Sequence, residues 1–375
     1  MNDELFMLWL SSLTPYISSR KLNTLLEVFG TARNAFAASG IELERAANLT
    51  TNAMREVSKR HNYQYIEELL ALMQECFIAY FSREHERFPA LLKEIPDPPV
   101  GIFCMGSLPS DNTHKVAIIG SRHCSEYGLM AARLLAKPLA EKGIVVVSGM
   151  ARGVDSMAHR GAISGGGQTI AVLGCGADFC YPPENKELRD DIVKNGCVIS
   201  EYPPKVGPSQ HFFPARNRII SGLSSGIIVV EARKKSGTLI TVDQAMEQGR
   251  EVMAVPGNIS SKLSEGTNQL IREGAHPVSD YTDILFALGL SVTATEPQQE
   301  TSNESSNKNS NETFNKSHLA PEEKRVYDSL GLEPVSFDKL MEVTNLQPGQ
   351  LRLICTELEI KELIRKLPGS RYVRA

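Results

Sequence analysis

The sequence predicts an α/β protein in which a doubly wound, mostly parallel sheet follows an N-terminal all-α domain and precedes a C-terminal winged-helix domain. Continuous apolar runs alternate with helical segments through the middle of the chain, which is typical of parallel strands buried on both faces. The segment before them carries apolar residues at helical spacing. The last segment carries three helical patterns and then two strand patterns around a Pro-Gly turn.

Residues 1–85 are expected to form the all-α domain. Leu22, Leu25 and Phe29 follow helical spacing, and Gly30 ends this helix shortly before another pattern begins. The arrangement resembles a helix-hairpin-helix or SAM-like element. Such hairpins either hold DNA phosphates through backbone N–H groups or only pack against a neighbour, and the sequence leaves both roles open.

Residues 86–290 are expected to form a Rossmann-like domain, which begins at the proline-rich stretch FPALLKEIPDPPVG. Its strands are predicted at residues 100–104, 116–119, 144–147, 169–173, 198–200, 226–230 and 252–255. Ligands of such sheets bind at the carboxyl ends of the strands, where turns expose backbone N–H groups and helices begin. We therefore look for functional residues in these turns.

Residues 291–318 are rich in Ser, Asn, Thr and Glu and have few large apolar side chains, so we expect a disordered linker. Residues 319–375 then follow the winged-helix plan. The helix near residues 347–360 would enter the major groove in a DNA-binding winged helix, but Glu357 and Glu359 would repel phosphate. We therefore expect this domain to bind another protein or to have a regulatory role.

The composition restricts the class of function. The chain has 375 residues, a formal net charge of −4 and a pI near 6.1, so nucleic-acid binding would need a local basic groove rather than bulk positive charge. No apolar stretch is long enough to span a membrane and the N-terminus is acidic, so we expect neither membrane insertion nor secretion. The seven cysteines form no CxxC pair. They are expected to be reduced thiols in a cytoplasmic protein that holds no metal and no cofactor.

Two turns of the predicted sheet carry features that suit phosphate. The first parallel strand ends at Gly120, Ser121 and Arg122, which combine a tight turn, a hydroxyl group and a bidentate guanidinium. A later strand ends in EARKKSGTLIT, a basic loop in which Lys235 precedes Gly237 at the start of a helix. The dinucleotide motif GxGxxG is missing, so these turns do not predict a nicotinamide site.

Acidic residues and a histidine follow other strands. We expect Asp155 to cap the helix that follows SGMARGVD, and we expect the lone His159 to be structural. A later strand ends in SEYPP, in which Glu201 is either a base or the partner of Arg216. The Walker sequence, GxSxG and HExxH are absent, so the corresponding ATPase, hydrolase and metalloprotease activities are not predicted.

The segment QHFFPARNRIISGL places two aromatic residues beside two arginines, and we expect it to be a loop ahead of an apolar strand. Guanidinium groups pair with phosphate in a fork, and an aromatic ring stacks on any base, so the segment suits single-stranded nucleic acid. The alternative is an ordinary loop in which Phe212 and Phe213 fill a core. The segment alone does not decide between them.

Several long motifs in the same order resemble the DNA-processing protein A family, DprA or Smf. They are VAIIGSR, SGMARGVDSMAH, AVLGCGADFCYPPEN, ISEYPP, FFPARNRIISGL, VVEARKKSGTLIT and EGTNQLIREGA. The resemblance covers roughly residues 88–290. It implies a protein that is not an enzyme, that binds and shields single-stranded DNA during natural transformation, and that loads the recombinase RecA onto it.

The resemblance also implies roles for particular residues. The turn at residues 120–122 would line the DNA pocket, Phe213 would stack on a base, and residues 216–218 would hold phosphates. Gln210 and His211 stand where some members have a basic residue, which would weaken binding or make it depend on pH. The predicted DNA-binding residues are Gly120, Ser121, Arg122, Lys186, His211, Phe213, Arg216, Asn217, Arg218, Lys235 and Gly237.

The resemblance also implies a homodimer built through the sheet domain. The helix around Met246 and residues 268–278 are the candidate faces for the second copy and for RecA. Leu270 and Ile271 in the second segment would serve equally well in a core.

Two other functions remain as alternatives. The first is a nucleotide-binding or nucleotide-cleaving enzyme of the phosphoribohydrolase type. Its PGGxGTxxE loop is reduced here to Gly-Thr, and Thr241 stands where the catalytic glutamate is required. The second is a structural adaptor that acts through the winged-helix domain, which would leave the arginine-bearing turns unexplained.

Overall fold

The structure is a computed structural model that describes residues 3–290, 320–331, 334–361, 363–367 and 371–374. The chain divides into two compact units, Met1–Val292 and Thr293–Ala375, each of which is described by itself. The predicted linker, residues 291–318, lies outside the described residues.

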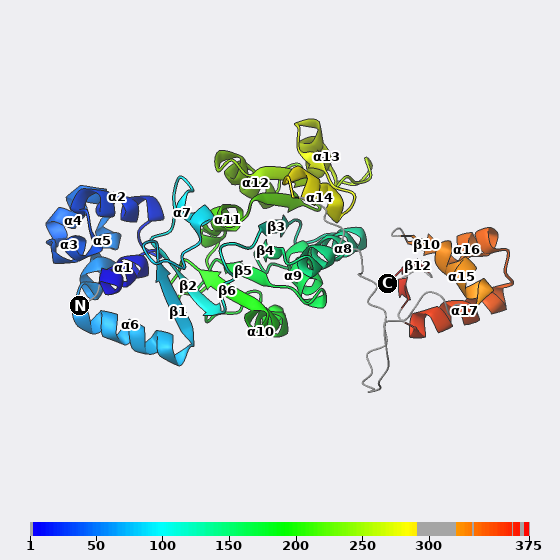
Figure 1. The fold of residues 1–375 in the computed structure, drawn as a ribbon, viewed down its shortest axis with the longest axis horizontal. Helices are drawn as coiled ribbons and strands as arrows, with labels where there is room; N and C mark the ends of the chain where they lie inside the picture. Colours follow the sequence, from blue (N-terminus) through cyan, green and yellow to red (C-terminus); the bar gives the residue numbers. More distant parts are fainter. Residues whose placement is uncertain (1–2, 291–319, 332–333, 362, 368–370, 375) are drawn as a thin grey trace, which may run out of the picture. The chain divides into compact units, whose positions relative to one another are not determined.

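The first unit begins with a helical region, as the sequence predicts (Figure 1). Its helices are α1 (Asp3–Ser12), α2 (Ser19–Phe29), α3 (Ala32–Ala37), α4 (Gly40–Ala47), α5 (Thr51–Arg60) and α6 (Tyr63–Glu75). Several are capped by a side chain that accepts a first-turn N–H, including Thr31, Ser39 and Asn62. Trp9 is fully buried among apolar side chains of these helices, so the region has a core of its own.

Nine strands in the described part of this unit form one sheet, in the order β1-β2-β6-β5-β4-β3-β7-β8-β9. Their bounds are β1 (Ile78–Ser82), β2 (Gly101–Gly106), β3 (Lys115–Ile119), β4 (Val145–Ser148), β5 (Thr169–Leu173), β6 (Gly196–Ser200), β7 (Gly226–Val229), β8 (Glu251–Ala254) and β9 (His276–Pro277). Strands β3 to β9 are parallel, and β2 joins them antiparallel to β6. Every strand predicted from an apolar run is present, so the Rossmann-like fold is confirmed.

Strand β1 corrects the prediction that residues 1–85 are entirely helical. It pairs antiparallel with β2, with Ile78 opposite Met105 and Ser82 opposite Gly101. The helical segment therefore supplies an edge strand of the sheet. On α6, Leu69 and Met73 pack with residues of β5 and β6, which joins the helical region to the sheet.

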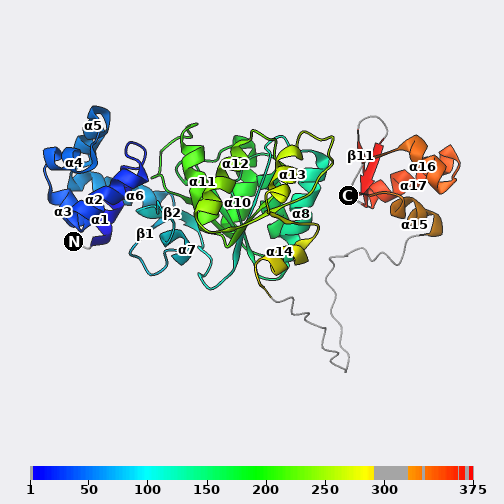
Figure 2. The same ribbon diagram turned by 90° about the horizontal axis from the view of Figure 1, so that it is seen from above.

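Helices cover both faces of the sheet (Figures 1 and 2). One apolar cluster joins the sheet to α7 (Ala90–Lys93), α11 (Phe212–Gly222), α12 (Gly237–Glu247) and α13 (Glu265–Arg272). On the other face are α8 (Glu126–Glu141), α9 (Val154–Ser164), α10 (Lys186–Lys194) and α14 (Tyr281–Ala287). Alternate side chains of a strand enter different clusters, for example Val145 and Val146, because successive residues point to opposite faces.

The second unit is a winged helix, which confirms that part of the fold. Its elements are α15 (Pro321–Asp328), β10 (Val335–Ser336), α16 (Phe337–Thr344), α17 (Pro348–Ile360), β11 (Ile364–Leu367) and β12 (Arg371–Arg374). The strands form a sheet in the order β10-β12-β11, and Leu340, Leu351 and Leu358 are buried in its core. Glu357 and Glu359 of α17 are exposed. No helix in the described part of the chain has the length and apolar character needed to cross a membrane.

Candidate nucleic-acid interface

A narrow crevice lies at the carboxyl ends of the parallel strands. It is lined by the turn after β3, the turn after β4, the segment after β5 and helix α11, through the residues Arg122, Gly149, Ala151, Arg152, Tyr181, Pro182, Phe213 and Arg216. These segments are far apart in the sequence and meet because the strands before them run in the same direction. The fold therefore brings Arg122, Phe213 and Arg216 to one site.

Phe213 is the centre of this crevice. The guanidinium carbon of Arg122 lies over its ring, 5.4 Å from the centroid. The ring of Tyr181 is also close to Phe213, with 5.4 Å between centroids and an interplanar angle of 32°. Aromatic rings and a cation that gather in one crevice suit a nucleobase and the phosphate beside it.

The segment that carries Phe213 is a helix, which corrects our prediction of a loop. Helix α11 starts at Phe212, whose ring stacks on the buried Tyr202 with 4.2 Å between centroids. Residues three apart on a helix share a face, so Phe213 and Arg216 both reach the crevice. Residues two apart do not, and this places Arg216 and Arg218 in different surroundings.

Arg216 is buried beneath the crevice, although the sequence led us to seek it as a phosphate contact. Its side chain is 4% exposed and Nη1 donates to the carbonyl of Val172 at 2.6 Å. Nε has no hydrogen-bond partner. Burial lowers the pKa of this guanidinium to about 10, and Asp155 only partly offsets this effect. Arg216 remains charged at neutral pH and retains donor capacity for an anion.

The turn after β4 is built around Arg216. A side chain at Gly149 would force Arg216 to move, because its Cβ would overlap Nη1 of that arginine. Asp155 does not cap α9, since the helix begins at Val154 after Gly153. Its buried carboxylate instead accepts a hydrogen bond from the N–H of Ala151 at 3.4 Å, and burial raises its pKa although Arg216 acts in the opposite direction.

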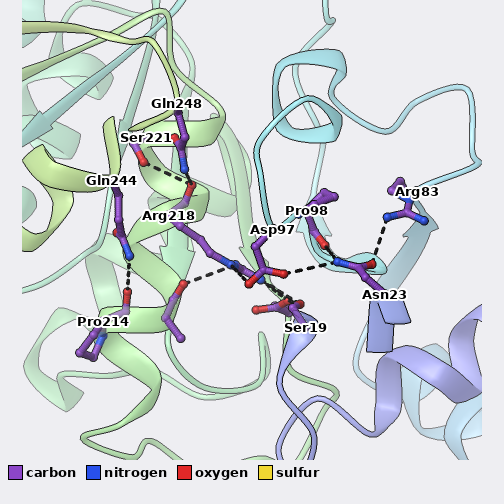
Figure 3. A network of polar contacts seen from close by, with 12 residues as sticks. Ser19, Asn23, Arg83, Asp97, Pro98, Pro214, Arg218, Ser221, Gln244 and Gln248 are labelled. Carbon is purple, nitrogen blue, oxygen red and sulfur yellow. Dashed lines mark hydrogen bonds and ion pairs between the residues drawn. The ribbon is translucent and has the colours of Figure 1, made fainter. Parts of the chain in front are cut away.

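Arg218 points away from the crevice into the boundary with the helical region. Its Nη2 lies 2.6 Å from Oε1 of Glu201 and 2.9 Å from Oγ of Ser19, and its Nε lies 3.4 Å from Asp97. Figure 3 shows Ser19 and Asp97 beside the Arg218 guanidinium. Glu201 therefore pairs with Arg218. One of our alternatives paired it with Arg216, and that prediction is wrong.

The charge of Arg218 is compensated, unlike that of Arg216. Burial alone would lower the pKa of Arg218, but the carboxylates of Glu201 and Asp97 outweigh burial and raise it. Gln248, which follows the end of α12, also donates to the Arg218 carbonyl at 3.0 Å (Figure 3). Arg218 thus joins α11 to its neighbours, and the structure does not bring it to the crevice.

The other predicted residues differ in how closely the structure ties them to the crevice. Ser121 is half-buried, and its Oγ accepts from the N–H of His123 at 3.2 Å. Thr238, next to Gly237, donates to the Gly120 carbonyl at 3.3 Å, so the start of α12 lies beside the turn after β3. Asn217 is half-buried on α11. Three of the predicted residues are exposed, and no described contact joins them to the crevice. They are Lys186, His211 and Lys235.

Arg152 and Tyr181 line the crevice but are missing from our predicted site. Arg152 forms an ion pair with Glu184, and both side chains are about half exposed, at 56% and 49%. Tyr181 is 38% exposed. Its signal in the sequence was present, since an aromatic residue follows the β5 strand in the run GADFCYPP, at the edge where the other site residues were sought.

The start of α8, where a nucleotide phosphate would bind in many Rossmann folds, is filled by a protein carboxylate. Glu231 is buried and accepts from the Ser125 N–H at 2.8 Å and the Ser125 hydroxyl at 2.6 Å. Its oxygens take up the N–H group that an anion would use. A phosphate at this helix start would meet the carboxylate of Glu231.

No metal-binding cluster is found among the described residues, and burial keeps Cys124 and His159 neutral. No group of three or more His, Cys, Asp or Glu side chains gathers among them in a way that could hold a metal ion. Burial raises the pKa of the Cys124 thiol near the crevice to about 11, so it is not a thiolate at neutral pH. Burial lowers the pKa of His159 to about 3, and its Nδ1 contacts Thr169 Oγ1 at 2.6 Å, which fits the expected structural role.

Comparison with known proteins identifies the family. The model described as DNA recombination-mediator protein A matches residues 79–289, and the DprA winged helix domain model matches residues 311–370. DNA processing protein DprA of Streptococcus pneumoniae is 45% identical over 217 residues, which are 55% of this chain and 77% of that protein. Protein Smf of Escherichia coli is 35% identical over 310 residues, with 82% and 80% covered.

Solved structures agree with this result. The X-ray structure of DprA from Streptococcus pneumoniae has a TM-score of 0.65 at 36% identity, and the match covers 76% of this chain and 98% of that one. A DprA structure from Helicobacter pylori, described for its single-stranded DNA binding mode, has a TM-score of 0.51 at 32% identity, with 56% and 95% covered. From these matches and the shared architecture, the chain belongs to the DNA recombination-mediator protein A family, the DprA/Smf family of DNA-processing proteins.

Proposed function

We propose that this protein binds single-stranded DNA in the crevice, without preference for base sequence, and that it acts by binding rather than by catalysis. The observation that carries the proposal is the convergence of Arg122, Phe213 and Arg216 from separate elements. Phe213 and Tyr181 offer ring faces to bases, and the two arginines offer charge to phosphates. The Helicobacter pylori relative, described as binding single-stranded DNA, supports this function.

The cellular role that fits this site is a recombination mediator. The protein would act in the cytoplasm, shield incoming single strands during natural transformation and load RecA onto them. The support is the family description as a DNA recombination-mediator protein. A site that binds phosphates and bases reversibly suits this task, because the strand must later pass to another protein.

A homodimer would place two such crevices on one strand and raise the overall affinity. The exposed apolar side chains of α12 support this arrangement, since Met246 is 57% exposed and Ile240 is 41% exposed. In the second candidate segment, residues 268–278, Leu270 is buried in the core, so α12 is the better candidate. Light scattering should give the mass of a dimer for the native chain and a lower mass for Met246→Glu.

The nucleotide-cleaving alternative has less support. Thr241, in place of the catalytic glutamate, is 3% exposed within α12 and does not face a substrate. Glu231 blocks the helix start at which a free nucleotide would be held. Both features favour a polymer that is bound along its length over a nucleotide that is cleaved.

Binding to labelled single-stranded and double-stranded oligonucleotides of one sequence tests the proposal. We expect retention of the single strand, weaker retention of the duplex, and weaker binding of both at higher salt. In the duplex the bases are stacked on each other and cannot reach Phe213. Equal affinity for single strand and duplex, or full single-strand affinity in Arg122→Met, would contradict it.

A further inference from the structure

A second pocket, of about 330 Å³, lies where the helical region meets the segment after β6. Both sides contribute to it, through Tyr16, Tyr65 and Glu68 from the helices and Pro203, Pro204 and Lys205 from the sheet domain. The segment after β6 is at the same edge of the sheet as the crevice, because β6 runs parallel to β5. The pocket and the crevice therefore open along one edge.

Two tyrosine rings line the pocket, and an arginine side chain contacts both of them. The guanidinium carbon of Arg60 lies 4.4 Å from the ring centroid of Tyr16 and 5.6 Å from that of Tyr65. Arg60 also donates to the Tyr16 hydroxyl at 2.7 Å and pairs with Glu56 at 2.6 Å, so both of its terminal nitrogens bond within the protein. Tyr16 stays 39% exposed. Rings that are held in place in this way can receive a base with little loss of side-chain freedom.

Lys205 supplies a cation at the rim. Its backbone has a φ of +64°, which is uncommon for a residue other than glycine. Both carboxylate oxygens of Asp178 accept from its N–H, at 3.1 and 3.0 Å, and hold it in this conformation. The side chain is exposed. Glu68 carries the one carboxylate among the lining residues, and Gln64 donates to its Oε1 at 2.8 Å.

A short loop after β5 connects the pocket with the crevice. On one side, the ring of Phe213 packs on Gly174, where an added Cβ would lie 2.9 Å from Cδ1. On the other side, the N–H of Gly176 donates to the carbonyl of Val206 at 2.7 Å. Two residues of chain span at most about 7 Å, so the two sites border the same few residues. A strand that leaves Phe213 can reach the pocket within a few nucleotides.

We propose that this pocket is a second subsite for single-stranded DNA, which extends the bound strand from the crevice onto the helical region. A base would stack on Tyr16 against the Pro203–Pro204 wall, and a phosphate would meet Lys205. The proposal rests on the proposed function, since both sites take the same strand. It gives the helical region a direct part in binding, through side chains and not through a helix hairpin.

Two substitutions of opposite charge test the subsite. Lys205→Gln removes one phosphate contact, which should reduce the salt slope by about 0.7 and the affinity by about fivefold at about 0.1 M salt. Glu68→Gln removes a repelling charge, so it should raise the affinity. Both effects are expected on a labelled oligothymidylate long enough to occupy both sites, on the order of 15 nucleotides, and not on one of about five that fills the crevice alone. Lys194→Gln, at an exposed lysine of α10, is the control. It should leave the affinity for both oligonucleotides unchanged.

The outcomes separate this inference from the proposed function. If Lys205→Gln and Glu68→Gln both bind the long strand like the native chain while Arg122→Met binds it weakly, the second subsite is wrong and the crevice remains. If the native chain binds no single strand, both proposals fail together. A gain in Glu68→Gln with a loss in Lys205→Gln supports the subsite, because a purely structural role would not give effects of opposite sign.

Discussion

The contrast between Arg216 and Arg218 leads to a prediction about salt. Both are buried arginines of α11, two residues apart, but only Arg216 lines the crevice and lacks full compensation of its charge. Each phosphate that a single strand places on a cation contributes about 0.7 to the slope of log affinity against log salt. Arg122→Met and Arg216→Met should therefore each lower the slope by about 0.7, and the double variant by about 1.4.

The assay is fluorescence anisotropy of a labelled oligothymidylate, titrated at several salt concentrations from about 50 to about 200 mM. Arg218→Met is the matched control, because it removes the same charge from the same helix. Its slope should equal that of the native chain, although its stability falls. Melting curves for each variant check that the proteins are folded at the temperature of the titration.

Two results would refute this reasoning. A slope that falls as much in Arg218→Met as in Arg216→Met would mean that both arginines meet phosphate, and that the pairing of Arg218 with Glu201 opens when DNA binds. A slope unchanged in Arg122→Met would mean that phosphates are held elsewhere.

Three further predictions follow from the structure. Phe213→Ala should lose about 1 to 3 kcal/mol of single-strand affinity, the worth of one stacked base, while Phe213→Tyr should keep most of it; equal affinities in anisotropy would remove Phe213 from the site. Arg218→Met should lower the free energy of unfolding by about 3 to 5 kcal/mol, since it leaves Glu201 buried without its partner, and adding Glu201→Leu should restore much of the loss in urea titrations. Removal of residues 292–375 should leave single-strand affinity close to that of the full chain, and a large loss would show that the winged helix binds DNA.

Most of the sheet could be predicted from the sequence because its strands are buried on both faces. Such strands read as unbroken apolar runs, like the one at residues 169–173, and they stand out from the helices around them. Strand β1 was missed because IAYFS is short and directly follows the end of α6, where it was taken as part of the helical domain. Only its pairing with β2 separates it from that domain.

The candidate site was predicted in part. Gly120, Arg122 and Phe213 follow strands in recognisable motifs, so their place at the sheet edge could be inferred. The sequence does not predict the direction in which the arginine side chains of α11 point. That direction depends on the segment being a helix and on the residues that pack against each face of it. Arg218 finds Glu201 and Ser19, which come from distant parts of the chain, and no local pattern predicts such a meeting.

The carboxylate of Glu231 at the start of α8 has a consequence for selectivity in the cell. Free nucleotides and dinucleotide coenzymes are abundant, and an open helix start on this fold would collect them. Here that place is already filled from within the chain. A small phosphorylated metabolite would therefore meet a carboxylate at this place, which disfavours its binding there.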